Sequence, residues 1–77
     1  MDAQLTMRYD RIGDILYIET RTPYAEQESE ELDESVVARK NPSTGEIENL
    51  EVLFFSERLK RGDELRLPVS IHMKPAS

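Results

Sequence analysis

The sequence predicts a mainly β (α+β) fold, a small antiparallel sheet of four to five strands with one short helix. Three observations support this prediction. Apolar and polar residues alternate in several stretches with the period of a half-buried strand, turn-forming residues separate these stretches, and one short stretch has the capping and charge pattern of a helix. All 77 residues are expected to form a single domain, because a chain of 8.9 kDa has room for one core.

The first two strands are predicted near the N-terminus. Leu5, Met7 and Tyr9 alternate with polar residues, so one side of this strand should be buried. Residues 15–18 are apolar on both faces, which predicts a strand near the centre of the sheet. The Asp and Gly residues of 10–14 are typical of a turn, so the two strands should form an antiparallel hairpin.

Residues 20–34 are predicted to form an acidic loop. Six acids and no base fall within residues 26–34, and the apolar residues of the segment are too few to bury a helical face. Three of these acids are candidate interaction residues, Glu28, Glu30 and Glu31, because their field would speed the approach of a small basic protein partner. A solvated loop is the simpler alternative, since charge runs often only solubilise a chain.

Two further strands are predicted on either side of a hairpin turn. The β-branched run at 36–38 predicts a third strand, and residues 41–45, which include Pro42 and Gly45, predict the turn that follows it. Residues 47–55 alternate over the longest and most apolar stretch of the chain, so this strand is a second candidate for the sheet centre.

The C-terminal part predicts the short helix and a final strand. Ser56 is expected to cap the helix N-terminus, and Gly62 is expected to end the helix. Apolar residues alternate again from 65 to 73, which predicts a last strand at about 64–74. Pro68 has no N–H to donate to a ladder, so this strand should lie at an edge of the sheet.

Apolar residues on both sheet faces predict association with a second chain. Phe54 and Phe55 are neighbours in the predicted strand, so they should point to opposite faces, with Leu53 on the side of Phe55. A helix of one or two turns is too short to cover a whole face, and without Cys the chain has no disulfide to stabilise it. Leu53 and Phe55 are therefore candidate interaction residues, and the expected partner is another copy of the chain or a small basic protein. The alternative is that the acidic loop or the last strand covers this face.

The sequence gives little support for catalysis or cofactor binding. The single histidine, His72, has no second His and no Cys to complete a usual zinc set, and Glu51 is expected to face solvent. No serine has the surroundings of a nucleophile elbow. We therefore predict a protein that is not an enzyme and takes no cofactor or metal. A small carboxylate- or metal-dependent enzyme built on an oligomeric cleft remains an alternative.

Nucleic-acid binding is another alternative that the sequence disfavours. The bases at 58–66 form the one basic cluster, Arg58, Lys60, Arg61 and Arg66, and such charges could neutralise phosphates. The whole chain is acidic, however, with 10 Lys and Arg against 16 Asp and Glu and a net charge of −6. Bases at the C-terminal end of a helix explain the cluster more simply.

The composition predicts a cytoplasmic protein without membrane contact. The longest stretch free of charge covers residues 67–73, far short of the roughly 18 apolar residues that a membrane span needs. The residues after Met1 show no basic region and no apolar core of a signal peptide. The absence of Cys fits a reducing compartment.

Several of these stretches together resemble a known family. The stretches are Tyr9-Asp10, residues 14–18, Ser35-Val36, residues 44–53 and Ser56. Their pattern resembles the small prokaryotic family DUF2283, a domain of unknown function, over roughly residues 7–59. The resemblance implies a small antiparallel sheet with a short helix and no assigned activity. It also implies an antitoxin or immunity partner, because some members are encoded beside small toxin-like proteins. Our prediction is a small non-enzymatic protein-interaction module that binds through an apolar sheet face.

Overall fold

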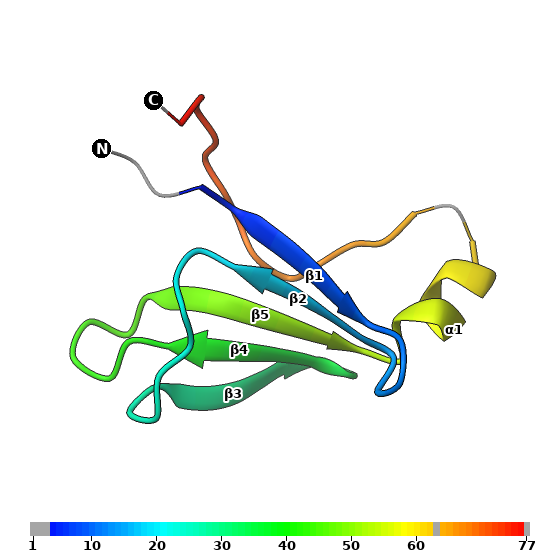
Figure 1. The fold of residues 1–77 in the computed structure, drawn as a ribbon, viewed down its shortest axis with the longest axis horizontal. Coiled ribbons are helices and arrows are strands. Elements are labelled where there is room, and N and C mark those ends of the chain that lie inside the picture. The colour runs from blue at the N-terminus through cyan, green and yellow to red at the C-terminus, as the bar shows by residue number, and fades with distance from the viewer. Residues whose placement is uncertain (1–3, 63, 77) are drawn as a thin grey trace.

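The computed structural model, which describes residues 4–62 and 64–76, confirms the predicted fold class. Five antiparallel strands form one sheet in the order β1-β2-β5-β4-β3, and one short helix, α1, follows the last strand (Figure 1). The elements are β1 (Thr6–Asp10), β2 (Ile15–Glu19), β3 (Glu28–Asp33), β4 (Val36–Lys40), β5 (Ile47–Leu53) and α1 (Phe55–Lys60).

β5 lies at the centre of the sheet, as its length and apolar content predict. It pairs with β2 on one side and with β4 on the other, and these pairings place Val36 opposite Val52 and Ala38 opposite Leu50. These four side chains are the buried apolar core. Because opposite residues in an antiparallel ladder share a face, all four lie on one face, which we call the core face. The other face, called the polar face, carries residues such as Tyr17 and Glu51.

The prediction of a loop over residues 20–34 is wrong for Glu28–Asp33, which form the edge strand β3. β3 pairs with β4, so its backbone supplies hydrogen-bond partners to the N–H and C=O groups on the outer side of β4. Its acidic side chains are tolerated because an edge strand keeps them in water, and Leu32 alone turns to the core as a half-buried residue. Glu30 also accepts a hydrogen bond from Lys40 Nζ at 2.7 Å, and this contact raises the pKa of Lys40.

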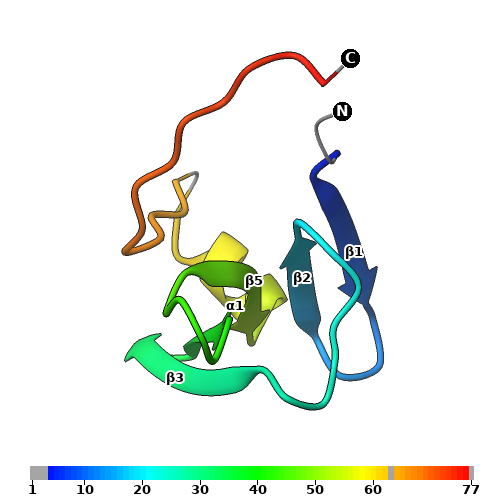
Figure 2. The ribbon, with the colours of Figure 1, turned by 90° about the vertical axis from the view of Figure 1, so that its left-hand side faces the viewer.

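The predicted final strand is absent: the described part of the C-terminal segment, residues 64–76, contains no strand. The segment is extended and runs along one side of the sheet toward the N-terminus (Figure 2). Leu67 and Val69 pack against the core, so the alternation from 65 to 73 reflects a chain lying across a face instead of pairing at an edge. Pro68 favours this arrangement, because it lacks an N–H and lies between two residues whose backbone groups bond to each other, Val69 N to Leu67 O at 2.8 Å.

α1 starts differently from the prediction, and this changes where two candidate residues lie. Phe54 adopts a left-handed conformation with φ 53, which ends β5 at Leu53 and turns the chain into the helix. Phe55 is therefore the first helical residue, and its ring lies 5.6 Å from that of Tyr9, centroid to centroid. Tyr9 is opposite Leu16, which is opposite Val52, so Phe55 meets the core face. The expectation that Leu53 and Phe55 share a face is wrong, because the strand alternation stops at Phe54.

Candidate interaction surface

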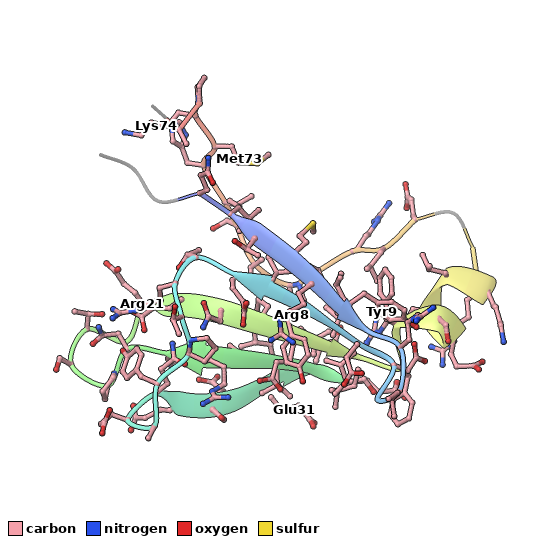
Figure 3. The ribbon with its side chains drawn as sticks, in the orientation of Figure 1. Arg8, Tyr9, Arg21, Glu31, Met73 and Lys74 are labelled. Atoms are coloured by element: carbon pink, nitrogen blue, oxygen red, sulfur yellow. The ribbon has the colours of Figure 1, made fainter. Side chains whose placement is uncertain are left out.

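Of the nine large apolar side chains that are exposed in the described residues, five lie at β1 or toward the end of the C-terminal segment; the other four are Ile12, Ile47, Phe54 and Leu59. Leu5, Met7 and Tyr9, which alternate on the core-face side of β1, are 45%, 60% and 42% exposed. Ile71 and Met73 of the C-terminal segment are 66% and 74% exposed, and both line a hollow together with Leu5. Figure 3 shows Met73 beside the N-terminal end of β1. We call these five residues the β1 surface.

The groove next to the β1 surface is formed by the C-terminal segment lying over the core face. Its apolar walls come from Leu5, Ile18, Leu50, Val69 and Ile71. Leu50 is buried and Ile18 is half-buried, whereas Leu5 and Ile71 open to solvent. The groove therefore links the buried core to Leu5 and Ile71 of the β1 surface, and polar residues at Thr20, Glu48, Asn49 and Ser70 also line it.

The two edges of the sheet differ in their protection. The β3 edge carries exposed acids at Glu28, Glu30 and Glu31, and its pairing with β4 is interrupted by a bulge between Glu31 and Asp33. Charged side chains and bulges are the devices by which natural sheets block edge-to-edge pairing. β1 has regular pairing with β2 over its whole length and contains no proline. Its one base, Arg8, lies over the ring of Tyr17 at 4.1 Å and bonds Glu19 at 3.4 Å.

The structure separates the five residues that the sequence singled out for interaction. Glu28, Glu30 and Glu31 lie together on β3, and Figure 3 shows Glu31 far from Met73. Leu53 is half-buried at the end of β5, opposite Ile15. Phe55 is half-buried against Tyr9. Leu5, Met7, Ile71 and Met73 were not among the interaction residues predicted from the sequence. Their signal in the sequence is the apolar alternation of residues 5–9 and 65–73, which marks them as apolar contact residues without showing what they contact.

A hydrogen-bonded cluster fixes α1 to the β1–β2 turn. Asp14, at φ 57, accepts bonds from Tyr9 Oη at 2.6 Å, from Ser56 N at 2.9 Å and from Ser56 Oγ at 2.7 Å. The bonds from Tyr9 and Ser56 lower the pKa of Asp14, and the hydrogen bond to Asp14 raises the pKa of Tyr9. Ser56 is thus a donor to a carboxylate from another turn. The prediction that Ser56 caps the helix is wrong, because the N-cap residue is Phe54. The cluster explains how a six-residue helix is held in place without any fully buried residue of its own.

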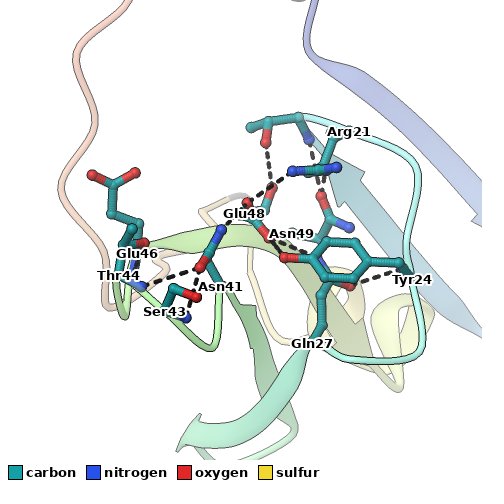
Figure 4. Close-up of polar contacts among 10 residues, drawn as sticks. Arg21, Tyr24, Gln27, Asn41, Ser43, Thr44, Glu46, Glu48 and Asn49 are labelled. Atoms are coloured by element: carbon teal, nitrogen blue, oxygen red, sulfur yellow. Dashed lines mark hydrogen bonds and ion pairs between the residues drawn. The ribbon is translucent and has the colours of Figure 1, made fainter.

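A second polar cluster fastens the loop between β2 and β3 to the sheet. Glu48 is the extra residue of a bulge, because Arg39 pairs with Asn49 and Lys40 pairs with Ile47. Its carboxylate accepts hydrogen bonds from four side chains (Figure 4), which are Tyr24 at 2.7 Å, Gln27 at 3.1 Å, Asn41 at 3.3 Å and Arg21 at 3.3 Å.

These hydrogen bonds shift the pKa values of Glu48 and Tyr24 in opposite directions. The bond from Tyr24 is the main cause that lowers the pKa of Glu48 from 4.5 to about 2, and the bonds from Gln27 and Asn41 add to it. The same carboxylate raises the pKa of Tyr24. Every group in the cluster is used in holding the loop, so we assign it a structural role.

The described residues offer little that fits catalysis or metal binding. Within residues 4–62 and 64–76, no three His, Asp or Glu side chains are grouped so that they could hold a metal ion. Glu51 forms an ion pair with Arg39 at 3.2 Å, and His72 is exposed.

Three of the four bases at 58–66 have partners within the chain. Arg58 donates to the backbone oxygen of Glu34, Lys60 lies 3.5 Å from Glu57, and Arg66 lies 3.1 Å from Glu64. The carboxylates of Glu57 and Glu64 thus offset the charges of Lys60 and Arg66, whereas the contact of Arg58 is to a neutral carbonyl group. No helix in the described part of the chain is long and apolar enough to cross a membrane.

Comparison with known proteins gives one match. The family model described as "Protein of unknown function (DUF2283)" matches residues 6–56. The match runs from the first strand into the start of α1, so it includes Asp14 and Ser56 of the cluster above and leaves the C-terminal segment outside. No curated protein and no solved structure matches the chain.

Proposed function

The chain belongs to the DUF2283 family, whose function is unknown, and we propose from its geometry that it is a non-enzymatic protein-interaction module. Binding uses the β1 surface, and the mechanism is occlusion: the module covers a surface of its partner and is covered in return. The proposal keeps the binding mode predicted from the sequence, an apolar surface of the sheet, and moves it from Leu53 and Phe55 to β1.

One observation carries the proposal: the exposed side chains of Leu5, Ile71 and Met73 line one hollow, which adjoins the groove over the core face, and Met7 is exposed on the same strand edge two residues after Leu5. Single exposed apolar residues are normal on soluble proteins, but grouped ones mark interaction sites. Methionines are also adaptable contact residues because their side chains are flexible and polarizable.

The charge distribution supports the same function. Glu28 and Glu31 lie exposed on β3, at the edge farthest from β1 in the strand order. Their field acts on the approach of partners, attracting basic ones and repelling acidic ones, more than on the final affinity. An antitoxin or immunity role, which the family resemblance implies, is one form of this function, in which the occluded surface belongs to a small toxin-like protein.

The test is methionine footprinting with hydrogen peroxide. Met7 and Met73 are both exposed in the isolated chain, so in dilute purified protein they should oxidise nearly as fast as in the denatured chain. In an extract of the native cell, at the natural concentration, we expect both to be protected several-fold, as quantified by peptide mass spectrometry. Equal oxidation of both residues in extract and in dilute purified protein would refute the proposed function.

A further inference from the structure

We propose that the partner at the β1 surface is a second copy of this chain, paired antiparallel through β1 about a two-fold axis so that two five-stranded sheets become one. Met7 then lies opposite the partner's Met7, and Leu5 lies opposite the partner's Tyr9. The inference rests on the proposed function, because it names the chain that covers the β1 surface.

The direction of the backbone groups on β1 supports this pairing. Thr20 N donates to Glu48 O at 3.1 Å, and Phe55 N donates to Asp14 O at 3.1 Å, so the even-numbered positions of β2 point toward β5. Neighbouring residues of a strand direct their N–H and C=O groups to opposite sides. The odd-numbered positions of β2 therefore point to β1, where they pair with Thr6, Arg8 and Asp10.

The residues of β1 between these positions have their backbone groups at the outer edge of the sheet. These residues are Met7 and Tyr9, whose apolar side chains are exposed on the core-face side, and Leu5, which directly precedes the strand, continues their alternation and is exposed as well. A second β1 strand would therefore receive both hydrogen bonds and apolar contacts from the same three residues. Each opposed pair can exchange two N–H···O=C bonds, as in any narrow antiparallel pair.

The register follows from charge. Two-fold pairing needs edge-directed residues to face each other, and the registers that pair the most residues between Leu5 and Asp10 are centred at Met7 or at Arg8. A centre at Arg8 would place it opposite the partner's Arg8, and directly opposed like charges are destabilising. A centre at Met7 instead places Arg8 opposite the partner's Thr6, and it stacks apolar side chains along the core face.

The run of acids on β3 does not oppose this pairing, because Glu28, Glu30, Glu31 and Asp33 lie at the far edge of the sheet. β3 is four strand spacings from β1 in the order β1-β2-β5-β4-β3. At about 4.8 Å per spacing this is about 19 Å, which exceeds the Debye length of about 8 Å at physiological ionic strength. Self-pairing through β3 is opposed in contrast, since it would bring Glu28, Glu30 and Glu31 of both copies together.

The decisive experiment compares Met7→Lys with the matched control Ile12→Lys by light scattering across protein concentrations. Both substitutions exchange an exposed apolar residue for lysine, but Ile12 lies in the β1–β2 turn and is 99% exposed. We expect the wild type and Ile12→Lys to approach 2 × 8.9 = 17.8 kDa, and Met7→Lys to remain near 8.9 kDa with an unchanged circular dichroism spectrum. A wild type that stays at 8.9 kDa at high concentration would overturn the inference, as would equal masses for the two variants.

Amide hydrogen exchange distinguishes edge pairing from any other dimer. The amides of Met7 and Tyr9 should exchange slowly in the wild type and fast in Met7→Lys, because only edge pairing protects them. A mass of 17.8 kDa with fast exchange at both amides would mean packing through a face and would overturn the inference. If the purified protein is a monomer but Met7 is protected in the cell extract, the second copy is refuted while the proposed interaction function stands.

Discussion

Replacing Glu48 by Gln should remove one acid-sensitive component of the stability. The four donors around Glu48 hold its pKa at about 2 in the folded chain, against 4.5 as its ordinary value. A depressed carboxyl pKa stabilises the fold above the ordinary value, and this stabilisation is lost as the pH falls toward the folded value. Between pH 4.5 and 2 the unfolded chain therefore binds one proton at Glu48 that the folded chain does not bind.

The size of the effect is measured as the slope of the logarithm of the unfolding constant against pH. In this window the logarithm of the unfolding constant of the wild type should rise with falling pH more steeply than that of Glu48→Gln, and the slope difference should be close to one proton. Urea unfolding followed by circular dichroism at closely spaced pH values between 3 and 7 measures it. Glu46→Gln removes the same charge at an exposed position two residues away and should keep the wild-type slope.

If the logarithm of the unfolding constant has the same pH dependence in Glu48→Gln and in the wild type, the reasoning is refuted, because the cluster would then not stabilise the ionised carboxylate of Glu48. Tyr24→Phe gives a second check within the same cluster. It removes the shortest of the four bonds, 2.7 Å, and leaves three donors, so its slope should lie between those of the wild type and Glu48→Gln.

Three further predictions concern the core, the helix and the surface predicted from the sequence. Val52→Ala should lower the free energy of unfolding by about 2 kcal/mol in urea titrations, because two methyl groups are lost from a fully buried site; a change below about 0.5 kcal/mol would contradict the packing described. Asp14→Ala should speed amide exchange throughout α1 while β4 and β5 stay protected, because Asp14 supplies the bonds to Tyr9 and Ser56; unchanged exchange in α1 would show that the cluster does not hold the helix. Phe55→Ser should loosen α1 but leave the mass by light scattering unchanged, since the ring of Phe55 faces Tyr9 within the chain; loss of association would return the interface to Leu53 and Phe55.

The strands that could be predicted from the sequence are those whose apolar side chains pack against the core. Leu50 and Val52 alternate with polar residues because one face of β5 is buried; the same period marks β1, whereas β4 is marked by its run of apolar residues at 36–38. β3 could not be predicted in this way, because it is joined to the sheet mainly by backbone hydrogen bonds to β4 and not by apolar side chains. Leu32 is its one apolar contact with the core, so an acidic edge strand and an acidic loop have the same composition.

The candidate site was missed because periodicity does not tell where a strand lies or what an extended segment pairs with. The alternation from 65 to 73 has the period of a strand, yet the segment is not paired in a sheet. Its apolar residues Leu67 and Val69 instead pack onto the core face. The turn at Phe54 has a similar cause: its positive φ is set by the connection between β5 and α1 and by the bonds of α1 to Asp14, which no local pattern in the sequence encodes.

The small core explains why the open edge at β1 has consequences for stability as well as for binding. Only four apolar residues are buried in the described chain, Val36, Ala38, Leu50 and Val52, and a domain of this length buries about 60% of the surface that its unfolded chain exposes. Covering Leu5, Met7 and Tyr9 with a second chain adds apolar burial next to this core. Association and folding are then linked by mass action, so the unfolding midpoint of the wild type should rise with protein concentration, whereas that of Met7→Lys should not. The acids on β3 leave this gain intact because they lie at the edge that does not pair.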